Sequence, residues 1–232
     1  MSDLTLVIGN KNYSSWSLRP WLLLRELGIA FEEVLVPFGE PGQPSPFHAF
    51  SPTGKVPCLV DGDTVVWESL AIAEYLAERD ARVWPAERLA RAWARCAAAE
   101  MHAGFSDLRN VCPMSCGVRM RIDAPPAGLA RDLARLDALW CQGLTRFGGA
   151  FLAGDAFTAV DAFFAPVAFR VQSYGLALSA PAADYAARLL ALAPMQAWYA
   201  AALAETWRDE AHEAEARAVG VLLADHRAAP AG

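Results

Sequence analysis

The sequence predicts an α+β protein in which a small mixed sheet with packed helices is followed by a helical region. The first eighty residues alternate β-rich and helical stretches. After Pro85, Ala, Arg and Leu recur at helical spacing, and no stretch has a convincing strand pattern. The composition changes across residues 80–86. We therefore expect two domains, one over residues 1–80 and an all-helical one over residues 86–226.

The first forty residues predict a β-α-β unit. Residues 4–8 are β-rich, and residues 17–27 carry Leu and Trp at helical spacing. Gly28 supplies the residue type that ends helices in the left-handed conformation. A second β-rich stretch, residues 31–36, ends at a proline. Two strands joined through a helix pair in parallel, so we expect a parallel pair here.

A hairpin and a second helix complete the first domain. Residues 39–54 are rich in Pro and Gly and predict an irregular connection. Residues 58–60 and 64–67 are β-rich and flank Asp61-Gly62-Asp63, which predicts a turn. An amphipathic helix follows from residue 69.

Helix breaks are expected at several points of the second domain. They lie near Cys112-Pro113, Asp123–Pro126, Gly148-Gly149, Gly175 and Pro181. Thr158 and Asp161 have the spacing of a capping box, with Asp in place of the usual Glu or Gln, so we expect a structural role for this pair.

Composition excludes several classes of partner. The 232 residues carry a net charge of −6 with the two signs interspersed, so no basic stripe favours nucleic acid. The chain is 55% hydrophobic, but no uncharged apolar run of about 18 residues predicts a membrane span. The first residues have no basic segment or cleavage site of a secretory signal, so the expected location is the cytoplasm.

Cysteine and histidine patterns do not favour a metal site. Five cysteines without export signals favour free thiols. Cys112 and Cys116 lack the Cys-x-x-Cys spacing, and the four histidines are scattered. We therefore expect no metal.

One stretch predicts a peptide-binding edge. Val56-Pro57 precedes the hairpin, and a Pro at a strand start often marks a cis bond. We expect a cis bond that turns the backbone N–H and C=O of Val56 to solvent, where an extended peptide can pair with them.

The next helix start predicts a second contact. Ser69 lies in its first turn, where free N–H groups and the helix dipole favour a carboxylate. Glu68 can accept an ammonium group. Backbone pairing beside a site for an α-amino-acid terminus fits a γ-linked tripeptide.

These motifs carry a resemblance to a known family. Lys55-Val56-Pro57, Glu68-Ser69 before LAIAEYLAE, and Thr158–Asp161 make the N-terminal half similar to the thioredoxin-like domain of glutathione S-transferases. The whole chain resembles a bacterial, serine-type, zeta- or theta-like member. The resemblance implies a thioredoxin-like domain followed by an all-α glutathione-transferase C-terminal domain.

The resemblance also implies roles for particular residues toward glutathione as co-substrate. Val56, after which Pro57 turns the chain, would pair with the cysteinyl backbone. Glu68 and Ser69 would hold the γ-glutamyl end. The glycyl carboxylate would lie near Lys55 or His48.

The catalytic group is expected in NYSSWSLRPW, between the first strand and first helix. Ser14 is the first candidate and Ser15 the second, by resemblance to the zeta-like Ser-Ser-Cys-Ser-x-Arg pattern. From the residues alone, a helix cap is the better interpretation of the pair. Tyr13 is an alternative hydroxyl donor, although packing is expected for it. Trp16 stands where the zeta pattern has Cys, which argues against zeta-type isomerisation.

The implied activity is attack of a glutathione thiolate on a small hydrophobic electrophile, a detoxification reaction. A second-substrate pocket is expected from Trp16, Phe105, Arg109, Val111 and Met114. Arg109 would orient an anionic substrate or be an ordinary helix arginine. The resemblance implies a homodimer. The alternatives are a glutathione-dependent isomerase or peroxidase, or a non-catalytic binding module.

Overall fold

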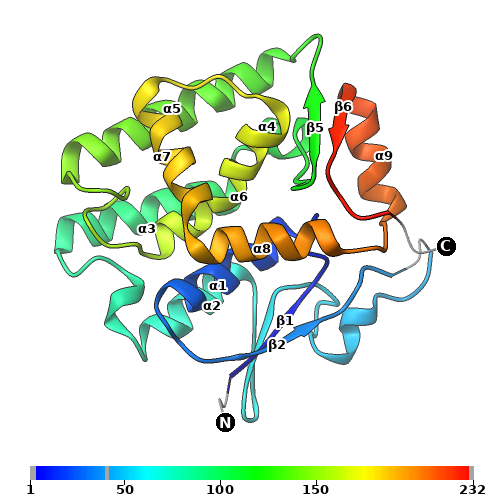
Figure 1. The fold of residues 1–232 in the computed structure, drawn as a ribbon. Coiled ribbons are helices and arrows are strands. Elements are labelled where there is room, and N and C mark those ends of the chain that lie inside the picture. The colour runs from blue at the N-terminus through cyan, green and yellow to red at the C-terminus, as the bar shows by residue number, and fades with distance from the viewer. Residues whose placement is uncertain (1–3, 40–41, 230–232) are drawn as a thin grey trace.

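The computed structural model describes residues 4–39 and 42–229, and Figure 1 shows a small sheet below a larger group of helices. The sheet has the order β2-β1-β3-β4. Strand β1 (Leu4–Ile8) pairs in parallel with β2 (Glu32–Leu35) and antiparallel with β3 (Cys58–Asp61). Strand β4 (Thr64–Trp67) closes the hairpin with β3. The predicted parallel pair and hairpin are confirmed.

Two helices pack with this sheet. Helix α1 (Ser15–Glu26) and helix α2 (Ser69–Ala77) bury their apolar residues in the same core as Leu6 and Ile8 of β1. Gly28 follows α1 with φ +67°, as its cap position requires. Two short 3₁₀ helices, η1 (Pro46–Ala49) and η2 (Ala81–Val83), lie in the connections.

The second part of the chain is mainly helical. Its helices are α3 (Arg88–Ala103), α4 (Ser106–Val111), α5 (Ala127–Phe147), α6 (Ala159–Tyr174), α7 (Ala180–Ala191), α8 (Ala193–Ala204) and α9 (Glu210–Val219). The expected helix breaks fall between these elements or, at Pro181, in the first turn of α7. A thioredoxin-like sheet followed by a helical domain is therefore confirmed as the fold class.

The expectation of no strand after residue 86 is wrong. Strand β5 (Val118–Arg121) pairs antiparallel with β6 (Val221–Asp225), and Figure 1 shows them side by side. Each is short. Strand β6 leaves most of its residues exposed and lacks the hydrophobic pattern of a half-buried strand, whereas β5 alternates apolar and charged residues over only four positions. Their pairing joins segments about a hundred residues apart, which no local pattern reports.

Helix α6 lies at the centre of the helical domain and is buried over most of its length. Helix α1 packs directly against it, so the two domains share one hydrophobic core. The boundaries 1–80 and 86–226 accordingly stay a prediction. Within the described ranges, no helix has the length and apolarity that a membrane crossing requires.

Candidate active site between the two domains

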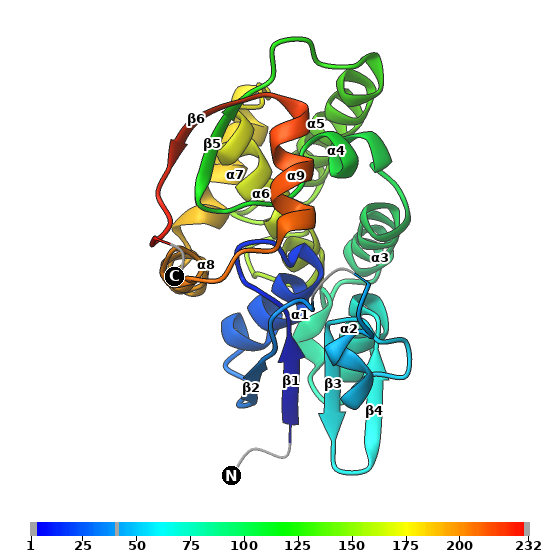
Figure 2. The ribbon, with the colours of Figure 1, turned by 90° about the vertical axis from the view of Figure 1, so that its right-hand side faces the viewer.

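A cavity of about 660 Å³ opens between the sheet domain and the helical domain. Its walls come from the β1–α1 loop, the connection before β3, helix α4 with the loop after it, and helix α9. Figure 2 shows the β1–α1 loop at the top of the sheet, with α9 and α4 above it. The lining includes Tyr13, Ser14, Ser15, Trp16, Phe38, Lys55, Val56, Arg109, Met114, Arg170, Asp209, His212 and Glu215.

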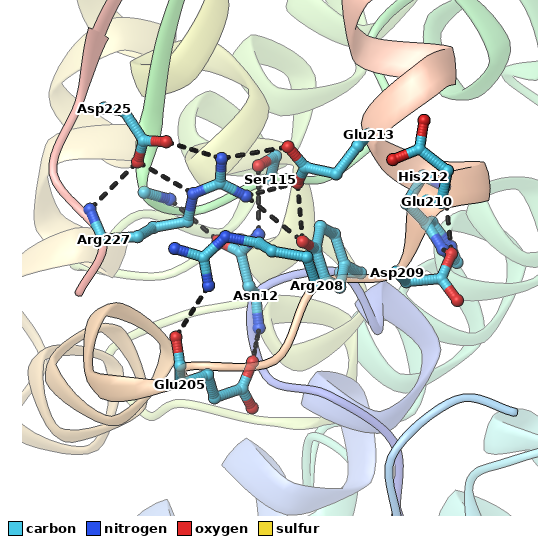
Figure 3. Close-up of polar contacts among 12 residues, drawn as sticks. Asn12, Ser115, Glu205, Arg208, Asp209, Glu210, His212, Glu213, Asp225 and Arg227 are labelled. Atoms are coloured by element: carbon cyan, nitrogen blue, oxygen red, sulfur yellow. Dashed lines mark hydrogen bonds and ion pairs between the residues drawn. The ribbon is translucent and has the colours of Figure 1, made fainter. Parts of the chain in front are cut away.

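The β1–α1 loop is fixed by the helical domain. Glu205, after α8, accepts hydrogen bonds from the backbone N–H groups of Lys11 (2.6 Å) and Asn12 (3.2 Å). The Asn12 side chain donates to Ser115 and accepts from Gly117 N–H. Figure 3 shows Asn12 between Glu205 and Ser115. These buried contacts hold the residue positions just before the serine pair.

Ser14 caps helix α1. Its Oγ accepts from the Ser17 backbone N–H (3.4 Å), and its hydroxyl donates to Ser17 Oγ (2.7 Å). Ser17 Oγ also accepts from Gly9 N–H (3.2 Å). Ser15 begins the helix, and its hydroxyl makes no hydrogen bond to any described residue. Both serines line the cavity, so the capping role of Ser14 and its access to a ligand coexist.

The Tyr13 hydroxyl is already hydrogen-bonded within the protein. The side chain is buried, and its Oη donates to Glu213 of α9 at 2.6 Å. Burial and this hydrogen bond raise the pKa of the Tyr13 phenol, so it keeps its proton. The proton of Tyr13 is committed to Glu213.

The Val56-Pro57 bond is cis, as the sequence predicts. Among the described residues, the backbone groups of Val56 form no hydrogen bond. Gly54, two residues earlier, has φ +63°, and a Cβ there would lie 2.5 Å from the His48 ring. Glycine is therefore required at this bend.

A smaller pocket of about 170 Å³ adjoins the cavity and shares three residues with it. Its lining consists of Trp16, Thr53, Lys55, Val56, Pro57 and Glu68. Glu68 precedes α2 with φ +70° and exposes half of its side chain. Its Oε2 lies 4.0 Å from Nε2 of His102, and burial lowers the pKa of that histidine, which favours the neutral ring.

Two predicted residues lie outside both pockets. The Ser69 side chain is buried, and its Oγ accepts from Arg19 Nη1 at 3.4 Å. His48 is exposed and packs on Gly54. Neither side chain lines the cavity or the smaller pocket.

Arginines gather around Trp16. The Arg19 guanidinium lies 4.1 Å from the Trp16 ring centre and 4.9 Å from that of Phe163, and Arg109 lies 5.3 Å from Trp16. Burial lowers the pKa of Arg19 and brings that of Arg170 to about 10. In the described part of the chain, none of these three arginines forms an ion pair with a carboxylate. This side of the cavity is electropositive.

Three of the five residues expected in the second-substrate pocket line the cavity. Trp16, Arg109 and Met114 line the cavity. Phe105 does not: it precedes α4 in the left-handed conformation (φ +54°) and its side chain lies in the core. Val111 packs half-buried against the same core and also lies outside the cavity. A left-handed backbone conformation is unusual for an aromatic residue, and the sequence does not predict it at Phe105.

Helix α9 supplies a wall that the sequence does not predict. Asp209, Ala211, His212 and Glu215 line the cavity from the C-terminal segment. Helical spacing places positions 211, 212 and 215 on one face. No local pattern indicates that this face returns to the β1–α1 loop.

Arg227 joins this segment to the loop. Its guanidinium is almost fully buried and pairs with Glu213 and with Asp225 (2.7 Å), and Nη1 donates to Tyr13 Oη (3.2 Å). Figure 3 shows Arg227 bridging Asp225 of β6 and Glu213 of α9. Over residues 4–39 and 42–229, no group of three or more His, Cys, Asp or Glu has metal-site geometry.

Comparison with known proteins shows a similarity in the N-terminal part of the chain. Residues 13–79 match the model of the glutathione S-transferase N-terminal domain. This part of the chain is similar to the N-terminal domain of glutathione S-transferases. Glutathione S-transferase F10 of Arabidopsis thaliana is 46% identical over 65 residues, which cover 27% of this chain and 30% of that protein. The chain spans less than a third of the length of the first curated relatives that it matches.

Solved glutathione S-transferases share the fold over most of the chain. A glutathione transferase homologue from Burkholderia, solved with bound glutathione, gives a TM-score of 0.63 at 24% identity and covers 86% of this chain and 97% of its own. A Tau class enzyme from mango, Mangifera indica, gives a TM-score of 0.66 at 18% identity and covers 94% and 99%. At these identities the likeness shows the fold.

Proposed function

We propose that this protein is a glutathione transferase whose cavity activates the glutathione thiolate for attack on a small hydrophobic electrophile. One observation carries the proposal. Ser14 and the unpaired backbone of Val56 line one cavity, and Val56 also lines the adjoining pocket with Glu68. An extended tripeptide paired with Val56 would reach Glu68 with its γ-glutamyl ammonium and Ser14 with its sulfur.

The thiol is the group that needs activation. A thiol with a pKa near ~8.5 is mostly protonated at neutral pH, and the thiolate is the nucleophile. Two neighbouring hydroxyls can exchange donor and acceptor roles by rotation. Ser17 can thus donate to Ser14 and leave the Ser14 hydrogen for the sulfur. Ser15, whose hydroxyl has no partner among the described residues, is the alternative donor.

The magnitude of this effect is sufficient. A hydrogen bond to a charged group contributes roughly 1.5–3 kcal/mol, and one pKa unit corresponds to about 1.4 kcal/mol. One hydroxyl would therefore lower the thiol pKa by about one to two units. The N-terminus of α1 adds a favourable dipole at the same point.

The remaining contacts follow from charge. Lys55 lines both pockets and suits the glycyl carboxylate, whereas His48 lies outside them. Met114 and the Trp16 ring offer an apolar surface to the second substrate. Arg109 and Arg170 make the same wall electropositive, which would favour a developing negative charge on the electrophile.

The same thiolate would serve a glutathione-dependent isomerase or peroxidase, and the fold alone would suit a non-catalytic binding module. A homodimer, a cytoplasmic location and a role in detoxification belong to this proposal as well. The edge strand β4 supports the dimer, because it exposes two apolar side chains.

Glutathione affinity tests the proposal. Glu68→Gln removes the charge that would meet the γ-glutamyl ammonium, and we expect a rise of at least tenfold in Kd by calorimetry. Glu74→Gln is the matched control, because Glu74 lies on α2 outside both pockets and pairs with Arg95. Equal affinities in wild type and Glu68→Gln would contradict the assigned orientation. Binding without turnover of any electrophile would favour the binding module.

A further inference from the structure

An Asp–His pair from the C-terminal segment lies in the wall of the cavity. Asp209 caps helix α9 and accepts the backbone N–H of His212 at 3.0 Å. The same Oδ1 lies 2.7 Å from His212 Nδ1. Both residues line the cavity that contains Ser14 and Ser15.

The His212 ring is held between two aromatic rings. Its centre lies 5.1 Å from that of Tyr13, with the planes 25° apart, and 5.0 Å from that of Phe38, with the planes 30° apart. Phe38 in turn borders the peptide-binding edge: a Cβ on Gly9 would meet Phe38 at 3.0 Å and Val56 at 3.3 Å. The imidazole is thus one ring away from the backbone proposed to hold glutathione.

The hydrogen bond to Asp209 fixes the tautomer. An ionised carboxylate only accepts hydrogen bonds, so Nδ1 of His212 must donate and carry the proton. Nε2 then carries the basic lone pair. In the described part of the chain, Nε2 has no hydrogen-bond partner, and 31% of the side chain is exposed. An oriented imidazole with a free basic nitrogen is the usual form of a general base.

Other charged groups near His212 are already engaged or differ in role. Glu213 of α9 is bound by Arg227 and by Tyr13 of the β1–α1 loop. Glu215 lines the cavity from α9 and forms no ion pair with another described residue, and Arg109 and Arg170 line the same cavity from α4 and α6. Arg208, just before α9, donates to the backbone carbonyl of Glu205.

We propose that His212, oriented by Asp209, is the catalytic proton acceptor of this site. The inference rests on the proposed function. The S–H bond of glutathione breaks, its proton moves to Nε2 and the electron pair stays on sulfur. The sulfur then forms the bond to the electrophilic carbon while the leaving group departs with the electrons of its own bond. The proton passes from His212 to the leaving group or to water.

This role is separate from that of the serine pair. A hydroxyl that donates to the sulfur stabilises the thiolate, but it does not remove the proton. His212 would accept that proton, and Asp209, which touches only the imidazole and the helix backbone, would act as a positioning residue.

The test compares single variants on full-length protein. His212→Gln removes the base, and Asp209→Asn keeps the N-cap while its amide can no longer enforce the tautomer. His226→Gln is the matched control, because His226 is exposed on the same segment and lines neither pocket. The measurements are glutathione Kd by calorimetry and the pH profile of kcat/KM with an electrophile that the wild type turns over.

We expect His212→Gln to lose at least tenfold in kcat at neutral pH, because general bases contribute about 10²–10⁴-fold. The acidic limb of the profile should move, because only the ionisation of the bound thiol then governs it, and the glutathione Kd should stay within twofold. Asp209→Asn should lose part of the rate, and His226→Gln none. Added imidazole should restore activity to His212→Ala.

Each contrary outcome has a distinct meaning. A kcat within twofold of wild type with an unchanged pH profile would overturn the role of His212 while leaving the proposed function intact. Rate loss with an unchanged profile and no rescue by imidazole would also overturn it, because the loss would be structural. A wild-type protein that does not bind glutathione would overturn the proposed function and this inference together.

Discussion

Single residues in the cavity wall combine structural and chemical roles. Ser14 caps α1 through Ser17 and lines the cavity, so the capping interpretation of the sequence does not exclude a ligand contact. The Tyr13 hydroxyl is not available to a ligand, because it donates its hydrogen bond to Glu213. The hydroxyls available to a thiol are therefore those of the two serines.

Asp161, in the first turn of helix α6, places its carboxylate in the interior of the helical domain. It is fully buried and accepts from Thr158 N–H (2.9 Å), Leu152 N–H (3.0 Å) and Tyr185 Oη (2.8 Å). The predicted capping box is confirmed. Burial raises the pKa of Asp161 to about 6, against an ordinary value of 3.8, although these hydrogen bonds oppose the rise.

This shift gives a prediction for stability against pH. Between about pH 4 and pH 6 the native state holds the Asp161 proton and the unfolded chain does not, so its contribution to stability falls as pH rises through that window. Asn does not titrate. We expect the stability advantage of wild type over Asp161→Asn to shrink by roughly 2 kcal/mol from pH 4 to pH 6, from the two pKa values.

Urea unfolding followed by Trp fluorescence measures this difference. Asp184→Asn is the matched control, because it makes the same substitution at an exposed position on α7. An advantage that grows with pH would place the native pKa of Asp161 below its ordinary value and contradict the prediction.

At the scale of elements, the C-terminal segment completes the cavity. Helix α9 supplies one wall, and β6 returns the chain so that Arg227 reaches Glu213 and Tyr13. Burial acts to raise the pKa of Glu213, but the hydrogen bonds from Arg227 and Tyr13 outweigh it and hold the pKa low. A charged Glu213 therefore depends on Arg227.

Arg227→Gln should loosen this segment without unfolding the protein. The variant loses charge-assisted hydrogen bonds that contribute about 2–3 kcal/mol, and it leaves the Glu213 charge partly buried. We expect amide hydrogen exchange to rise at least tenfold over residues 209–225 and to stay unchanged in α6.

The matched control is Arg217→Gln, which removes an exposed arginine that pairs with Glu210 on the same helix. Exchange that rises equally in both variants, or in neither, would show that Arg227 does not hold α9 in place.

The sequence predicts the features that depend on local patterns and misses those that depend on distant contacts. The β-α-β unit, the hairpin and the helix starts at Ser15 and Ser69 follow from local patterns of burial and turn residues. Strands β5 and β6, and the α9 wall with His212, depend on contacts between distant segments. Local periodicity cannot predict contacts between distant segments. It also does not predict the left-handed backbone conformation of Phe105.

The sequence motifs also differ in how they enter the site. Val56 and Glu68 line the smaller pocket. Val56 lies next to a turn and Glu68 at a helix start, so the path of the backbone brings both residues to the pocket. Ser69 and His48 do not line the pockets. The Ser69 hydroxyl accepts a hydrogen bond from the buried Arg19, and the His48 ring packs against Gly54. Spacing along the sequence does not give the directions in which these side chains point.

At the scale of the whole molecule, strand β4 is an unpaired edge of the sheet. Val65 and Trp67 alternate to the same side of β4, and both are exposed, at 39% and 42%. An edge strand with apolar side chains favours association with a second surface. This is the face we propose for the dimer.

Trp67→Lys should therefore separate the subunits. We expect wild type to sediment at twice the chain mass of 25.0 kDa and Trp67→Lys to sediment as single chains. Trp207→Lys is the control, because Trp207 has a similar exposure of 41% but lies between α8 and α9. A wild type that sediments as a single chain would refute the dimer.

The most direct test of glutathione activation is the thiol pKa of bound glutathione, titrated by thiolate absorbance in the ultraviolet. We predict a pKa about one to two units below that of free glutathione in the wild type, and a return toward the free value in Ser14→Ala. Loss of the shift in Ser15→Ala alone would transfer the role to Ser15. A bound thiol with the pKa of free glutathione in the wild type would contradict activation by the serine pair.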